Sequence, residues 1–161
     1  MSRPESWCSD YAQYTAGLNK MHLSSLIRFR LGSHDLRVAT GRWERVDNSS
    51  LPRHQRLCER CAAGQVEDEF HVVFECDAYL AVRERFWKLF VDFGHWNGSG
   101  IVVSPGGRSL ADFMQQRQSR VAAFIHHCFL VRNEPEMIGF LPAESSASET
   151  EYSELVEVSD A

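Results

Sequence analysis

Apolar side chains recur three and four positions apart in three segments of the chain, the spacing that lines one face of an α-helix. The first of these faces comprises Leu18, Met21, Leu26 and Phe29. Gly32 stands just after Leu31, where a glycine commonly ends a helix because it adopts a positive φ at little cost. The pattern therefore predicts an amphipathic helix that ends near Leu31.

The clearest amphipathic pattern lies between Cys76 and Gly94. Asp77 has a side chain suited to the N-cap of a helix, and Gly94 stands where the pattern stops. The apolar positions in between are Tyr79, Val82, Phe86, Leu89, Phe90 and Phe93. This segment predicts one helix over residues 77–93.

A third pattern begins at Ser109, which forms a possible capping box with Asp112. The apolar positions that follow at helical spacing are Leu110, Phe113, Met114, Val121, Phe124, Ile125 and Cys128. The pattern is compatible with one helix or with two helices separated by a break at residues 116–119. Both alternatives place a helical segment near the end of the domain.

Two connecting segments are rich in turn-forming residues. Residues 39–56 (ATGRWERVDNSSLPRHQR) predict an irregular loop that carries several arginines. Residues 94–107 (GHWNGSGIVVSPGG) predict a turn-rich connection with a short apolar run. The fold expected from all of these segments is a small, mainly α domain.

The negative charge of the chain is concentrated at its end. Residues 134–161 hold eight acidic residues and no Lys or Arg, whereas the formal net charge of the whole chain is -5, so the rest carries +3. Such a segment has too little apolar surface to offset the entropy of ordering, and we predict a disordered acidic tail. The remainder of the chain has a net positive charge, which is compatible with an anionic partner.

Length and composition fit one small domain. The 161 residues are 43% hydrophobic, and we expect an N-terminal segment over 1–19, a helical domain over 20–133 and the tail over 134–161. The sequence has neither an apolar run of about 18 residues nor a signal-peptide pattern. We therefore expect a soluble protein of the nucleus or cytoplasm, with no membrane partner. Its five cysteines are expected to stay reduced there rather than to form disulfides.

Metal-ligand chemistry is concentrated in CERCAAGQVEDEFHVVFEC, residues 58–76. The spacing is Cys-x2-Cys-x9-His-x4-Cys, formed by Cys58, Cys61, His71 and Cys76. Three thiolates and one imidazole complete the tetrahedral shell that Zn²⁺ prefers, and Gly64 supplies a position of free φ for the return of the chain. We predict one structural zinc ion in a CCHC knuckle, around which the helices assemble.

The second half of this motif allows two conformations. Residues 67–76 (EDEFHVVFEC) could form a short helix or a strand. The acids Glu67, Asp68 and Glu69 favour a helix N-terminus and are expected to be a solvated helix start. Because five positions from His71 to Cys76 exceed one helical turn, Cys76 is expected where that helix ends.

Other chemistry fits the sequence less well. A redox Cys-x-x-Cys needs a βαβ context, and the nucleobase deaminase signature has the opposite order of His and Cys. His126, His127 and Cys128 are adjacent on a helix and diverge, so they are interpreted as core or surface residues. A closed four-ligand site leaves no position for a substrate. We expect no enzymatic activity and no small-molecule substrate.

The motif and its flanks resemble a known family. Residues 53–86 are similar to the zinc-binding segment downstream of the reverse transcriptase in non-LTR retrotransposon polyproteins. The residues that carry this similarity are Arg56, Cys58, Cys61, Glu67, Asp68, Glu69, His71, Phe74, Cys76 and Tyr79. Weaker similarity extends over residues 20–133, and Asp77 stands where the family often has Pro. The resemblance covers neither a polymerase nor an endonuclease domain.

The resemblance implies nucleic-acid binding, with RNA or DNA as ligand and a reverse transcriptase domain or another protein as a further partner. The residues of this sequence suited to phosphate contact or base stacking are Arg28, Arg30, Arg37, Arg42, Trp43, Arg45, Arg53 and Arg56. Two alternatives stay open. In the first, the chain is a zinc-stabilised protein-interaction module; in the second, it is a non-functional remnant of a retroelement.

Overall fold

The computed structural model describes residues 18–91, 93–96, 101–103 and 109–136. Most of the predicted N-terminal segment (1–19) and acidic tail (134–161) lies outside these residues. The fold is mainly helical, as predicted. Its α-helices are α2 (Lys20–Arg30), α3 (Arg37–Thr40), α4 (Leu80–Arg85), α5 (Leu110–Met114) and α6 (Gln118–Asn133). Shorter helical turns are η1 (Arg53–Gln55), η2 (His71–Glu75), η3 (Asp77–Tyr79) and η4 (Trp87–Leu89).

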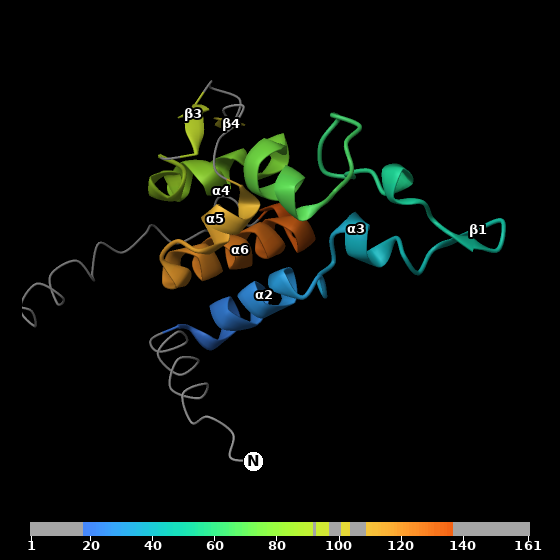
Figure 1. Ribbon diagram of the computed structural model, residues 1–161, viewed down its shortest axis with the longest axis horizontal. Coiled ribbons are helices and arrows are strands. Elements are labelled where there is room, and N and C mark those ends of the chain that lie inside the picture. Colours follow the sequence, from blue (N-terminus) through green and yellow to red (C-terminus); the bar gives the residue numbers. More distant parts are fainter. Residues whose placement is uncertain (1–17, 92, 97–100, 104–108, 137–161) are drawn as a thin grey trace, which may run out of the picture.

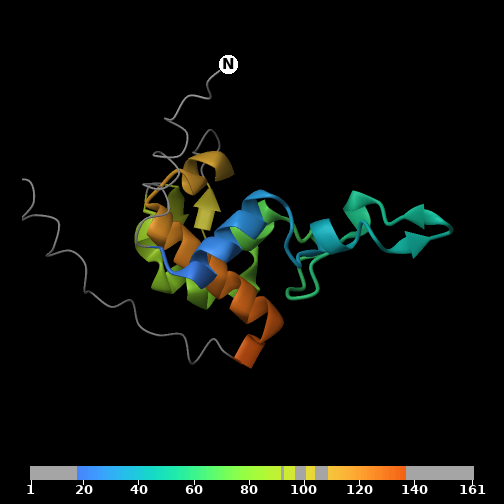
Figure 2. The same ribbon diagram turned by 90° about the horizontal axis from the view of Figure 1, so that it is seen from below.

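Helix α6 is the centre of the fold. It lies between α2 on one side and α4 and α5 on the other (Figure 1), and α2 crosses it (Figure 2). Leu26 and Phe29 of α2 are buried, as predicted, and the Phe29 ring lies 6.3 Å from that of Phe129. Met21, predicted on the same face, is 62% exposed, because it points away from α6 and His22 faces that helix instead. Within the described ranges, no helix is both long and apolar enough to cross a membrane.

The predicted end of α2 is confirmed. Gly32 has φ 61°, and its N–H donates to the carbonyl of Phe29 over 3.2 Å. The N–H of Ser33 donates to the carbonyl of Arg28 over 2.9 Å. This pair of hydrogen bonds is a Schellman motif, which satisfies carbonyls that the helix end would otherwise leave unpaired.

The predicted helix over residues 77–93 is interrupted, although all six of its apolar side chains are buried. Backbone angles leave the helical range at Tyr79 and at Phe86 (φ -100°, ψ 25°), so the segment consists of η3, α4 and η4. Asp77 also does not serve as the N-cap of a long helix. These bends let Phe86 and Phe90 curve around Phe124, with ring centroids 5.8 and 5.3 Å away.

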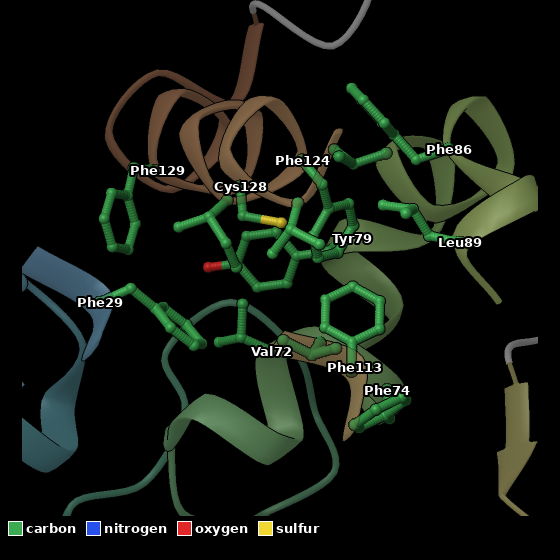
Figure 3. Close-up of a cluster of buried hydrophobic side chains, with 14 of the residues drawn as sticks. Phe29, Val72, Phe74, Tyr79, Phe86, Leu89, Phe113, Phe124, Cys128 and Phe129 are labelled. Atoms are coloured by element: carbon green, nitrogen blue, oxygen red, sulfur yellow. The ribbon is translucent and has the colours of Figure 1, made fainter. Parts of the chain in front are cut away.

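Aromatic side chains fill the core between these elements. Figure 3 shows side chains from α6, α5 and residues 72–89 meeting there. Phe113 stands edge-on to Phe74 and to Phe124, each at 5.6 Å, the arrangement that aromatic rings favour. The capping box that positions Phe113 is present as predicted, because Ser109 and Asp112 exchange hydrogen bonds. The chain then breaks between α5 and α6, which settles the choice in favour of two helices.

The first connecting segment forms a β-hairpin, and the described part of the second contains two paired strands. Strands β1 (Arg45–Val46) and β2 (Ser49–Ser50) pair antiparallel, and so do β3 (Gly94–Trp96) and β4 (Ile101–Val103). The prediction of an irregular loop over 39–56 was therefore wrong in part. Asp47 and Asn48 both have positive φ, 49° and 65°, which is the backbone of a tight hairpin turn. Residues 42–50, here called the arm, project from the body (Figure 2).

Three histidines meet where α2 crosses α6, and they predict acid sensitivity. The rings of His22 and His126 are 4.9 Å apart, and His126 Nδ1 lies 3.0 Å from the Ser25 hydroxyl. Burial first, and then repulsion from neighbouring histidines, lowers the pKa of both; burial and Arg85 lower the pKa of His127. The unfolded chain then binds protons that the folded chain resists, so the free energy of unfolding should fall as the pH drops below about 6.5.

Urea unfolding between about pH 7.5 and pH 5.5 measures this effect. His126→Gln should reduce the dependence on pH, because a neutral amide replaces one of the groups that resist protonation. The matched control is His54→Gln, whose histidine is exposed on η1. Neither variant changes a metal ligand, so acid titration of the ligands contributes equally to both measurements. Equal slopes for the two variants would contradict this assignment.

Candidate metal centre

The first two ligands lie on a loop closed by a short antiparallel ribbon. The N–H of Cys58 donates to the carbonyl of Gln65 over 2.8 Å, and the N–H of Glu67 donates to the carbonyl of Arg56 over 3.0 Å. Between these two bonds, Leu57 and Val66 form a β-bridge. Gly64 has φ 63° in the return of the loop, as its place in the sequence predicts. The ribbon therefore holds Cys58 and Cys61 on one tight turn.

The other two ligands lie at the two ends of the π-helical turn η2: His71 is its first residue, and Cys76 follows its last. The N–H of Cys76 donates to the carbonyl of His71 over 2.7 Å, a bond that spans five residues instead of the four of an α-helix. The wider turn places Cys76 on the same side as His71, whereas an α-helical turn would rotate it away. The helical alternative for residues 67–76 is thus confirmed, and Cys76 stands at the helix end as predicted.

The four ligand atoms converge. One ligand atom from each of Cys58, Cys61, His71 and Cys76 lies within 4.8 Å of the others. The sulfur atoms of Cys58 and Cys76 are 3.8 Å apart, and Cys61 Sγ is 3.3 Å from His71 Nε2. Two thiolates bound to one tetrahedral zinc ion at about 2.3 Å lie about 3.8 Å apart. The arrangement can hold a metal ion and is compatible with one zinc.

Hydrogen bonds within the cluster prepare it for a cation. The bond with Cys76 first, and then one with His71, lowers the pKa of the Cys58 thiol to about 3. Burial lowers the pKa of His71, but hydrogen bonds with Cys58, Cys61 and Glu75 outweigh it and raise this pKa to about 9. A thiolate and an imidazolium thus pair in the metal-free chain. A bound cation would replace the imidazolium proton.

Glu75 orients the imidazole ligand. Its Oε2 lies 3.3 Å from Nδ1 of His71, while Nε2 of the same ring faces Cys61. A carboxylate at Nδ1 keeps the proton on that nitrogen and leaves Nε2 free to bind a metal, as in many metal sites of proteins. Sequence reasoning missed Glu75, although its spacing of four from His71 was the available signal.

The acids before His71 stand at a helix start, as predicted, but Glu67 is not solvated, so that interpretation was wrong in part. Glu67 is 0% exposed, and its Oε2 accepts from Arg132 over 2.9 Å and from the backbone N–H of Arg37 over 2.7 Å. Asp68 caps the helical turn by accepting from the N–H of His71, and it pairs with Arg53. Hydrogen-bonding partners far along the chain draw these acids inward, and no local pattern indicates such partners.

Glu67 therefore connects three parts of the fold. Its carboxylate and carbonyl oxygens accept from the first N–H groups of α3, and its carboxylate also pairs with Arg132 on α6. Glu67 itself follows directly on the ribbon. The guanidinium of Arg60, from the Cys loop, reaches the carbonyl of Arg132. The metal cluster is thereby fixed to both α3 and α6.

Several arginines predicted to contact nucleic acid have acceptors within the protein. Arg56 donates to the carbonyls of Leu51 and Val38 over 2.9 and 2.8 Å. The remaining contacts are Arg28 with Asp35, Arg30 with Gln118 and the Met114 carbonyl, Arg37 with Glu44 and Glu59, and Arg53 with Asp68. These interactions connect α2, the arm and the cluster.

The other predicted contacts lie on the arm. Arg42, Trp43 and Arg45 are exposed, and Trp43 is 83% exposed, the highest value among the large hydrophobic side chains described. Arg45 donates to the carbonyl of Asn48 over 3.4 Å. The Arg42 guanidinium reaches Gly32, where an added Cβ would lie 3.5 Å from its Nη2. Trp43 is thus an accessible indole that stands between two arginines in the sequence.

The metal cluster is the only close grouping of its kind among the described residues. No other three His, Cys, Asp or Glu side chains there bring their ligand atoms near enough to hold an ion. His126, His127 and Cys128 instead pack between helices, in keeping with their interpretation as core or surface residues. No family model, no curated protein and no solved structure matches this chain, so its function has to be inferred from its own residues.

Proposed function

We propose that the protein is a zinc-stabilised module that binds RNA or DNA, without polymerase or nuclease activity of its own. The observation that carries the binding proposal is the exposed Trp43 between Arg42 and Arg45. The resemblance to the segment downstream of a retrotransposon reverse transcriptase supports the same role. A reverse transcriptase domain is then a further partner.

Zinc is the metal that suits the cluster best. Three sulfur ligands and one imidazole nitrogen favour a borderline-soft ion in tetrahedral coordination. Cys58, His71 and Cys76 are buried and Cys61 is half-buried, so the ligand set is closed. A closed set stabilises the fold, whereas a catalytic zinc needs a free coordination position. We assign the ion a structural role.

The metal centre would position the arm. Arg37 pairs with Glu44 at the arm and with Glu59 in the Cys loop. Arg56, in the ribbon, packs so closely on Gly41 that an added Cβ there would lie 2.7 Å from Arg56 Cγ. The base of the arm is therefore fixed to the loop that carries Cys58 and Cys61. Loss of the metal should release both together.

Binding to the arm should combine stacking with phosphate contacts. An indole stacks on a base of any sequence, and the guanidinium groups of the arginines near it in the sequence neutralise phosphates. In fluorescence anisotropy with single-stranded RNA or DNA, Trp43→Ala should weaken binding by about 1–3 kcal/mol, which is about 5- to 150-fold. Affinity should also fall as salt concentration rises. Removing Arg42 should reduce the slope of log affinity against log salt concentration by about one unit, the contribution of one phosphate contact.

Trp87→Ala is the matched control, because Trp87 is also exposed but lies on η4, away from the arm. It should leave the affinity for the oligonucleotide unchanged. Zinc content and helical signal are measured for every variant, so that loss of fold is not mistaken for loss of a contact. The proposal for the arm would be overturned if Trp43→Ala and Trp87→Ala lost the same affinity, or if the affinity did not depend on salt concentration.

One observation favours the alternative of a protein-interaction module. Trp87 and Val91 are 56% and 59% exposed and stand four positions apart. Exposed apolar side chains that lie together are typical of protein-binding surfaces. The same titration separates the two functions, because a chain that binds no oligonucleotide even at low salt would favour this alternative.

A further inference from the structure

Arg83 is a buried cation directly behind the metal ligands. Its side chain extends from α4 and is 0% exposed. Nη2 donates to the carbonyl of Cys76 over 2.7 Å, and Nη1 faces the carbonyl of Val72 at 3.3 Å. Both carbonyls belong to the turn that presents His71 and Cys76. The guanidinium is therefore held against the backbone of the ligands themselves.

No Asp or Glu among the described residues forms an ion pair with Arg83. The contrast with Arg132 is informative, because that half-buried arginine has the buried carboxylate of Glu67 at 2.9 Å. Burial lowers the pKa of Arg83, and the groups that oppose this effect most are Cys128 and Cys76, ahead of Asp77. A buried guanidinium without an ion-pair partner is costly: the two carbonyls accept from Nη1 and Nη2, but Nε has no partner and the charge is not balanced.

A metal centre built from these ligands supplies the missing charge. A divalent ion with three thiolates and one neutral imidazole carries a net charge of about -1. That charge is itself costly to bury. One guanidinium and one such centre cancel, and Arg83 contacts the carbonyl of a ligand residue.

We propose that Arg83 is the internal counter-cation of the metal centre, so that the guanidinium and the metal with its thiolates form one neutral buried unit. This proposal rests on the metal centre of the proposed function and is independent of nucleic-acid binding. It makes Arg83 a positioning and charge-balancing residue that favours a divalent ion held by three thiolates.

Zinc affinity, measured by competition with a chromophoric chelator, tests the proposal. Arg83→Met should weaken zinc binding by about 10- to 100-fold, the usual effect of removing a group that supports metal ligands. Arg83→Lys keeps the charge and should lose much less. Arg83→Gln keeps an amide donor for a carbonyl but has no charge, and it should weaken binding about as much as Met. If Arg83 acts only by capping the carbonyls, Gln should instead bind zinc as well as Lys does, and this result would overturn the proposal.

A changed ligand charge gives a second and sharper test. Cys61→His replaces the half-buried thiolate with a neutral imidazole, so the centre with zinc becomes neutral. In this background Arg83→Met should no longer weaken zinc binding. Arg132→Met, whose charge is balanced by Glu67, should have the same effect in both backgrounds.

If Arg83→Met weakens zinc binding equally in the unaltered chain, with three thiolates, and in the Cys61→His chain, with two, the charge argument is contradicted. If the Cys61→His chain takes up no zinc, the comparison of Lys with Gln at position 83 decides. Zinc uptake by the unaltered chain tests the metal centre by itself, and the oligonucleotide titration tests the arm. The counter-cation and the proposed function can therefore fail separately.

Discussion

Removal of zinc with a strong chelator is expected to abolish most of the helical circular dichroism of this protein. The cluster ties the ribbon to η2, and the ribbon continues into Glu67, which is bonded to α3 and α6. Apparent binding energies of structural zinc in small domains reach about 10–16 kcal/mol, more than the whole stability of most domains of this size. Adding back one equivalent of zinc should restore the signal.

A pair of cysteine variants makes this expectation specific. Cys76→Ser removes a ligand and should reproduce the chelated state. Cys128→Ser changes another buried cysteine, which lies in the α6 core and is not part of the cluster, and should keep one zinc per chain. Full helical signal in the chelated protein, or equal zinc loss in both variants, would show that the cluster does not hold the fold together.

Glu67→Gln is expected to be the most destabilising substitution outside the metal ligands. Both donors reach the same oxygen, Oε2, so the amide oxygen can keep these hydrogen bonds, but the Arg132 guanidinium would lose its counter-charge. Breaking a buried ion pair from one side costs about 3–5 kcal/mol. Unfolding by urea, with zinc in excess, measures the loss.

Two controls separate the buried pair from charge in general. Glu59→Gln removes an exposed partner of Arg37 and should cost about 1 kcal/mol or less. Glu67→Gln combined with Arg132→Met leaves neither charge alone, so the double variant should lose less than the sum of the single losses. Strict additivity would show that the two side chains are not coupled.

The sequence was informative where a structural feature depends on neighbouring residues. Tyr79, Val82 and Phe86 are buried as predicted, because helical periodicity reports which face of a segment is apolar whatever its exact ends. The ligand cluster could be predicted for a similar reason, since thiolates and imidazoles at short spacing have few other uses. The end of α2 at Gly32 follows from the conformational freedom of one residue.

Features that depend on distant residues could not be predicted. Phe86 interrupts its helix to pack against Phe124, and Glu67 turns inward to meet Arg132. In both pairs the partner lies far along the chain, where periodicity carries no signal. No local pattern singles out Arg83, and only the assembled core shows that its charge lies next to the ligands.

The crossing of α2 and α6 has a consequence for the order of events during synthesis. Helix α2 begins at Lys20 and α6 ends at Asn133, so the two helices stand at opposite ends of the domain in the sequence. The residues of the metal cluster leave the ribosome before α6 has been made. The nascent chain can therefore capture its ion while Leu26 and Phe29 still lack their packing partners, and completion of the core must wait for the final helix.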